Sequence, residues 1–99
     1  MRDFIERAFT RMQIEILKDL VENPSDPFTS WRRYLPTRLI DWEYRMFYSA
    51  VDKIETLGLI HKYGIARNIT VSFKGLYVYN KMQEMEFNNA TFIRLTSGG

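Results

Sequence analysis

The sequence predicts an α+β fold that is mostly helical, and three observations support this prediction. Apolar residues recur at three- and four-residue steps in three long segments, which is the period of the buried side of a helix. Two short stretches rich in β-branched and aromatic residues, 59–63 and 69–73, flank a turn and predict a hairpin. The 99 residues suffice for a single domain, 1–99, with one core. We therefore expect three helices, a two-stranded hairpin and a C-terminal helix.

The first helix is predicted over residues 1–23, with Asp3 as its cap and Asn23-Pro24 as its end. Its apolar residues follow helical spacing: Phe4, Ile5, Ala8, Phe9, Met12, Ile16, Leu17, Leu20 and Val21. The stripe is broad, so its first four members either belong to the core or extend past it to meet a second chain. A turn at 25–28 then leads into a short helix from Thr29 to Leu35, which Pro36 ends.

The rest of the chain is organised around residues 40–73, where a long helix runs directly into the hairpin. The helix should begin near Asp41, with Thr37 or Asp41 as its cap. It should end before Gly58, because a residue without Cβ takes the left-handed conformation cheaply. Its buried stripe is predicted to be Ile40, Tyr44, Phe47, Val51, Ile54 and Leu57. Other faces carry an indole, a thioether and two cations, which is typical of a surface that meets a partner: Trp42, Arg45, Met46, Ser49 and Lys53.

The hairpin is short and has a basic tip, and a further helix is expected after it. Ser72 or Phe73 should begin this helix, which covers residues 74–87 and carries apolar side chains at three-residue steps. Gly75 is expected to weaken its first turn. Residues 88–99 form a tail, in which Asn88-Asn89 stops the helix and Thr91 to Leu95 is either a strand or an ordered arm.

Charge and composition favour a binding protein over an enzyme. The net charge is only +2, but residues 29–74 carry eight basic and four acidic side chains, a balance typical of a phosphate-facing surface or of a merely solvated face. Cysteine is absent and there is one histidine, so we expect no disulfide, no zinc site built from soft ligands and no nucleophile with a base partner. We expect no cofactor, no metal and no enzymatic activity. Without an apolar run of signal or membrane-span length, we expect a cytoplasmic location and no membrane partner.

A pattern of residues suggests a family. The segments are Val51-Asp-Lys-Ile-Glu-Thr-Leu-Gly-Leu-Ile60, then Arg67, then Ile69-Thr-Val-Ser-Phe-Lys-Gly75. Together they resemble the winged helix-turn-helix transcriptional regulators of the MarR and PadR type, over about residues 12–82. The resemblance implies a helix-turn-helix at 29–57, a β-wing at 59–73 and, as in the compact winged helices of archaea and their viruses, a stand-alone module.

The chain departs from the family pattern in two places. The segment 32–38 is richer in aromatic and basic residues than the short second helix common in the family. The start of the long helix carries Asp41 and Glu43, and carboxylates are unfavourable beside phosphates. These carboxylates either accept from cytosine N4 or favour the positive end of the helix.

The predicted partner is double-stranded DNA, because a single helix fits the major groove and its exposed side chains then reach base edges. Arg45 is the expected base reader, since a guanidinium donates two parallel bonds to guanine, and Ser49 and Trp42 are secondary. Backbone contacts are assigned to Arg32, Arg33, Arg38 and Lys53. The wing residues are Lys62, Arg67 and Asn68, of which Arg67 can enter the minor groove. For the base readers the alternative is a solvated or intramolecular contact, and for Lys62 it is protection of a sheet edge.

A homodimer is the expected assembly, because pairing two modules places their recognition helices about 34–36 Å apart on successive major grooves. Its interface is assigned to the first and last helices, with Phe4, Phe9, Tyr79, Met82 and Phe87 as anchors. The rival interpretation is a winged-helix docking module that binds another protein and not DNA, through Trp42, Tyr48 and Tyr63. A small-molecule sensor would lie between the dimerising helices, but the sequence offers no set of ligand-binding residues.

Overall fold

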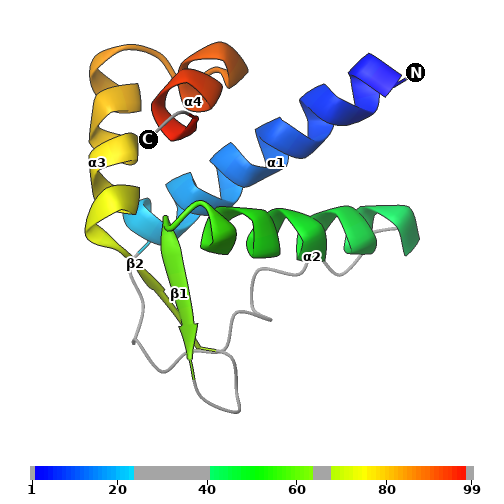
Figure 1. Ribbon diagram of the computed structural model, residues 1–99, viewed down its shortest axis with the longest axis horizontal. Coiled ribbons are helices and arrows are strands. Elements are labelled where there is room, and N and C mark those ends of the chain that lie inside the picture. Colours follow the sequence, from blue (N-terminus) through cyan, green and yellow to red (C-terminus); the bar gives the residue numbers. More distant parts are fainter. Residues whose placement is uncertain (1, 24–40, 64–67, 98–99) are drawn as a thin grey trace.

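The computed structural model describes residues 2–23, 41–63 and 68–97, with the side chains of 2, 41–44, 63 and 68 excepted. The elements in these ranges are α1 (Arg2–Glu22), α2 (Asp41–Thr56), β1 (Ile60–Tyr63), β2 (Asn68–Val71), α3 (Phe73–Glu84) and α4 (Asn89–Thr96). The described chain is thus mostly helical with a two-stranded antiparallel sheet, as predicted (Figure 1). The short helix expected at 29–35 lies outside the described residues. Within the described ranges, no helix is long and apolar enough to cross a membrane.

The core lies mainly between α1 and α2, which pack along one another (Figure 1). Both helices bury residues at three- and four-residue steps, because only one side of each faces the other elements. The side chains contributed by α2 are Phe47, Ala50, Val51 and Ile54, and those contributed by α1 include Ile14, Leu17 and Leu20. The predicted inner stripe of α2 is therefore confirmed for the residues whose side chains are described.

The chain leaves α2 through a tight corner at Gly58, whose φ of +79° favours a residue without Cβ. The amide of Gly58 donates to the carbonyl of Glu55, and the amide of the following Leu59 reaches back to Ile54. Lys74 from α3 donates to the carbonyl of Leu57 over 2.8 Å. Leu59 itself is completely buried, so the corner is fixed by hydrogen bonds and by packing.

The hairpin pairs Ile60 with Val71 and Tyr63 with Asn68. Because strand side chains alternate between faces, this register puts Ile60, Lys62 and their partners on the side that faces the core. Strand β2 ends at Val71, whereas the sequence predicted a strand that continues to Phe73. Ser72 and the residue after it leave the ladder because Ser72 caps the next helix.

The junction between β2 and α3 is unusually close. The hydroxyl of Ser72 accepts from the amide of Gly75 at 3.0 Å and donates to the carbonyl of Gly58. A Cβ added at Gly75 would lie 2.2 Å from the carbonyl oxygen of Leu59, closer than van der Waals contact allows. The sequence alone suggested that Gly75 weakens the first turn of this helix, whereas the structure shows that the packing of α3 on the corner requires it.

The tail is helical over Asn89–Thr96, so the strand predicted as one alternative for Thr91 to Leu95 was wrong. Helix α3 ends at Glu84, three residues earlier than predicted, and α4 begins at Asn89. The side chain of Asn88 accepts from the amide of Thr91 at 2.8 Å, which makes it an N-cap instead of a stop. Phe92 is 2% exposed. An eight-residue helix is marginal by itself, and burial of this ring against the core stabilises it.

Candidate nucleic-acid interface

The outer side of α2 forms the candidate interface. Arg45 and Ser49 lie one helical turn apart and are both exposed, and Lys53 continues the same side by a further turn. The opposite side of the helix is buried in the core, so these three side chains point to solvent. Within the described residues, neither Arg45 nor Lys53 forms an ion pair or a hydrogen bond. Both charges are therefore available to a partner.

Tyr48 borders this surface and is 40% exposed. Its ring meets the buried Phe47 edge to face, with centroids 6.1 Å apart and the planes at 86°. A ring held in this way offers a fixed apolar edge beside Arg45. It suits a sugar or methyl group as well as a protein partner.

Several predicted contacts fall outside the described residues. They are Arg32, Arg33, Arg38 and Arg67, together with the side chains of Trp42 and Asn68. For Asn68, the backbone is described and pairs with Tyr63 at the outer end of the hairpin. The structure therefore brings together Arg45, Ser49 and Lys53 from the predicted set.

Lys62 does not belong to the exposed surface that carries Arg45, Ser49 and Lys53. Its Nζ lies 2.5 Å from Asp52 Oδ1 and 3.4 Å from Glu55 Oε1, and its backbone amide also donates to Glu55. Only 13% of its side chain is exposed, because it lies on the core-facing side of β1. Lys62 thus binds the hairpin to α2, and no local pattern in the sequence indicates this pairing.

The ion pairs of Lys62 also change the charge of the candidate interface. Asp52 is 67% exposed on the same side of α2 as Ser49, and an unpaired carboxylate there would repel a phosphate. Lys62 compensates part of this negative charge. Among the described side chains of this stretch, Arg45 and Lys53 are the charges without an ion-pair partner.

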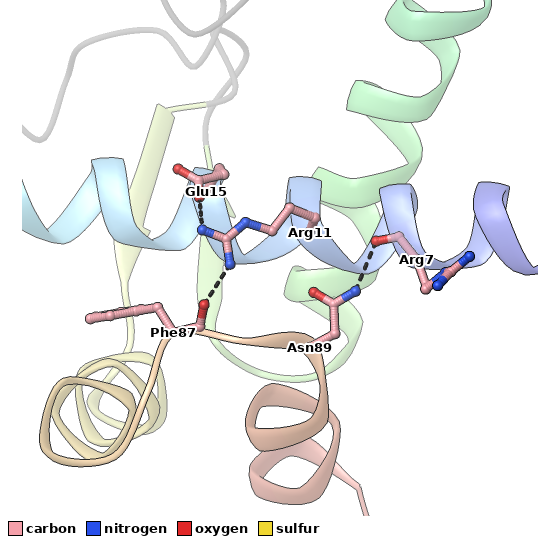
Figure 2. Close-up of polar contacts among 5 residues, drawn as sticks. All are labelled: Arg7, Arg11, Glu15, Phe87 and Asn89. Atoms are coloured by element: carbon pink, nitrogen blue, oxygen red, sulfur yellow. Dashed lines mark hydrogen bonds and ion pairs between the residues drawn. The ribbon is translucent and has the colours of Figure 1, made fainter.

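Other described cations are engaged within the chain. Lys74 donates to the carbonyl of Leu57, and Lys81 pairs with Glu84. Arg94 donates to the sulfur of Met85, and Lys18 lies over the ring of Phe87. Figure 2 shows Arg11 between Glu15 of its own helix and the carbonyl of Phe87, to which it donates over 2.5 Å. In the same view Asn89 donates to the carbonyl of Arg7 at 3.0 Å. These bonds attach the segment before α4, and α4 itself, to α1.

The predicted dimer anchors separate into two groups. Phe4 is 62% exposed near the start of α1, and Phe9 and Phe87 are half-buried. Met82 is 1% exposed and Tyr79 6% exposed, so both were wrongly assigned to a dimer surface: they belong to the core of their own chain. The three-residue steps of α3 predict one buried stripe, and α1 and α4 of the same chain cover it.

Tyr79 is held by a hydrogen bond that the sequence did not reveal. Its hydroxyl donates to Glu22 Oε2 over 2.7 Å, which joins α3 to the last turn of α1. This bond, burial and the negative charge of Glu22 raise the pKa of Tyr79 above its ordinary value of 10.0. The ring also packs on Phe87, with centroids 5.3 Å apart. Tyr79 is thus a structural residue.

Within the described ranges, no group of three or more His, Asp or Glu side chains is placed to hold a metal ion. Comparison of the chain with models of protein families, with curated proteins and with solved structures gives no match.

Proposed function

We propose that this chain is a winged-helix protein that binds double-stranded DNA in a sequence-specific way and regulates transcription as a homodimer. One observation carries the proposal. The side of α2 opposite the core exposes Arg45, Ser49 and Lys53 without intramolecular partners among the described residues. A helix that buries one side and exposes an arginine, a serine and a lysine at successive turns of the other side suits the major groove.

Each exposed residue has a role that follows from its chemistry. Arg45 donates two parallel hydrogen bonds to O6 and N7 of a guanine, and Ser49 donates to or accepts from a neighbouring base edge. Lys53, two turns further along, meets a backbone phosphate and fixes the register of the helix. Trp42 is a further base-contacting candidate from the first turn, and Arg32, Arg33 and Arg38 are candidates for phosphate contacts.

The hairpin lies beside the C-terminal end of α2, as a wing does (Figure 1). Because Lys62 is bound to Asp52 and Glu55, it does not reach DNA in this proposal. It positions the wing against the helix. Contact with the backbone and minor groove is assigned to Arg67 and Asn68, near the tip.

The homodimer rests on the start of α1. Phe4 is 62% exposed and Ile5 51% exposed, and the first turns of α1 extend away from the other elements (Figure 1). Two such ends that pack together would bury apolar area and place two α2 helices on successive major grooves, about 34–36 Å apart. A pseudo-palindromic binding site follows from the two-fold symmetry.

The decisive experiment is selection of bound sequences from a pool of random duplexes, followed by fluorescence anisotropy with the selected duplex and a scrambled one. The proposal expects an enriched motif with two-fold symmetry and tighter binding of the selected duplex. A pool that stays random after several rounds, with no salt-dependent binding of any duplex, would overturn it.

A second candidate function is protein docking, which the outer side of α3 favours. Phe73 is 93% exposed and Tyr77 55% exposed, one turn apart, with Leu76 beside them. A wholly exposed phenylalanine next to other apolar side chains is typical of a protein contact. Substitution of Phe73 and Tyr77 by serine would abolish a docking function and leave DNA binding through α2 intact.

A further inference from the structure

A cavity lies where α1, the end of α2 and α4 meet. Its volume of about 380 Å³ is within the range of small-molecule sites. The walls are of two kinds. Leu57, Phe92 and Ile93 supply apolar surface, and Thr10, Thr96 and Ser97 supply hydroxyl groups. The cavity thus has the mixed lining that binds a small amphipathic molecule.

Gln13 is the buried polar side chain among the residues that line this cavity, and its hydrogen bonding is incomplete. It is 4% exposed, and its amide nitrogen donates to the carbonyl of Phe9 over a long 3.4 Å. Its amide oxygen accepts no hydrogen bond from the described residues. A buried acceptor without a donor is costly, and Gln13 is one of the residues that line the cavity.

The position of Gln13 in the sequence supports this interpretation. It lies within the buried side of α1, next to Ile14 and one turn from the buried Leu17. A leucine at this position would complete the apolar stripe and bury no unsatisfied amide. An amide at this point provides hydrogen-bonding capacity that packing does not need.

Lys53 adds a positive charge to the same cavity. It is one of the lining residues, it is exposed, and it has no ion pair among the described residues. The cavity therefore combines an uncompensated cation, an apolar wall and a buried acceptor. A ligand that satisfies all three carries an anionic group, a short hydrocarbon body and a hydrogen-bond donor.

We propose that this cavity binds a small amphipathic anion, of which an ω-hydroxycarboxylate is the simplest form. Its carboxylate pairs with Lys53, its methylene groups pack on Phe92, Ile93 and Leu57, and its hydroxyl donates to the amide oxygen of Gln13. One consequence rests on the proposed function: Lys53 cannot pair fully with a ligand and a phosphate at once, so the ligand weakens DNA binding.

Binding to the cavity is tested on the protein alone, without DNA. The probes are 4-hydroxybutanoate, 6-hydroxyhexanoate and 8-hydroxyoctanoate, with hexanoate and 1-hexanol as partial mimics, titrated into isotope-labelled protein and followed by NMR. At least one hydroxycarboxylate should shift the side-chain amide signals of Gln13 and the methyl signals of Ile93 in a saturable way, and bind tighter than both partial mimics. Non-saturable shifts with every probe, or equal binding of 6-hydroxyhexanoate, hexanoate and 1-hexanol, would overturn the proposal.

Four variants assign the contacts. Lys53→Gln should weaken the carboxylate probes by roughly tenfold or more, the usual effect of losing one charged hydrogen bond. Gln13→Leu should make the hydroxycarboxylate no better than hexanoate. Ile93→Trp places an indole in the cavity from an exposed position and should abolish binding. Arg45→Gln, a cation on the same helix but outside the lining, should bind the probes as the unchanged protein does.

Measurements of DNA binding in the presence of the probe separate this proposal from the proposed function. If the probe saturates the cavity and lowers affinity for the selected duplex, both stand. If the probe binds but no duplex is bound at all, the cavity proposal stands and the proposed function fails. If Ile93→Trp binds the probe as well as the unchanged protein does, the cavity is not the site, whatever happens with DNA.

Discussion

The ammonium of Lys62 in β1 lies between two carboxylates of α2, 2.5 Å from Asp52 and 3.4 Å from Glu55. A strand residue that faces the core is usually apolar, and here a cation takes that place and reaches the neighbouring helix. The hairpin is therefore joined to α2 by charge as well as by the chain itself.

Replacement of Lys62 by methionine should keep the packing of the aliphatic part of the side chain and remove its charge. The expected loss of unfolding free energy is about 0.5–1.5 kcal/mol, a modest value because both carboxylates retain contact with water. Urea denaturation measures it. Lys81→Met, which removes an exposed pair with Glu84, is the matched control and should change stability by less than about 0.5 kcal/mol. A larger loss in the control would contradict the role given to Lys62.

Gly75→Ala should destabilise the protein although alanine favours helices. Propensity alone predicts a gain of up to about 1 kcal/mol, but the new Cβ would lie 2.2 Å from the carbonyl oxygen of Leu59. Relief of that overlap requires the helix to move, at a cost of about 1–3 kcal/mol. Thermal unfolding gives the sign directly. An increase in melting temperature would show that α3 does not approach the corner so closely.

Gly58→Ala provides a comparison at the same corner. The added Cβ would meet only Lys74 Cδ at 3.7 Å, an ordinary contact, so the cost comes from the positive φ alone. It should be about 1–2 kcal/mol. Gly58→Asn should cost less than alanine, because asparagine tolerates the left-handed region. No such rescue by asparagine is expected at Gly75.

The bond from Tyr79 to Glu22 should make stability depend on alkaline pH. Because the folded pKa of Tyr79 is raised above 10.0, the folded state holds the phenol proton more tightly than the unfolded chain does. The resulting stabilisation is complete below pH 10 and is lost as the pH rises through the folded pKa. Tyr79→Phe should lose about 1 kcal/mol at neutral pH and show a flatter alkaline decline. Tyr77→Phe, at an exposed position, should leave the decline unchanged.

In the proposed DNA complex, Arg45→Ala and Lys53→Ala should have different effects. Loss of Arg45 should cost about 1–3 kcal/mol at one base position and relax the sequence preference there. Loss of Lys53 should weaken selected and scrambled duplexes alike and reduce the salt slope by about one. Anisotropy titrations at several salt concentrations separate the two. Arg94→Ala, on α4, is the control cation, and equal effects of all three changes would contradict the assignment.

Phe4→Ser and Met82→Ala should distinguish an assembly surface from the core. Phe4 is exposed in the single chain, so serine there should weaken self-association by roughly tenfold or more without lowering the stability of the monomer. Met82 is buried, and alanine there should cost about 2–5 kcal/mol of folding free energy. Sedimentation at several concentrations and thermal unfolding measure the two effects. A protein that is monomeric at all concentrations would remove the homodimer from the proposal.

The sequence predicted those features that follow from local periodicity and from single special residues. The buried stripe of α2, the corner at Gly58 and the start of α3 near Ser72 are of this kind. Features that depend on contacts between distant segments escaped prediction. Lys62 appeared as a surface cation because its partners lie on another element, and Gly75 appeared unfavourable because Leu59 lies sixteen positions earlier in the chain.

The prediction for the C-terminal tail failed for a related reason. Asn88 signals a helix start as well as a helix stop, and only the burial of Phe92 against the rest of the chain decides between them. The candidate interface was predicted in part, since amphipathic spacing identifies which side of α2 is exposed. The cavity was not predicted, although Gln13 within an otherwise apolar stripe was a signal that could have indicated it.

The closeness of Gly75 to Leu59 has a mechanical consequence. Gly75 lets α3 lie directly against the corner, and Ser72 and Lys74 donate to the carbonyls of Gly58 and Leu57. The end of α2 and the start of α3 are therefore held rigidly together. A protein that binds the exposed side of α3 and tilts this helix would then move α2 and the hairpin with it as one unit. In the proposed DNA complex, a protein bound to α3 would thereby change the angle at which α2 meets the DNA.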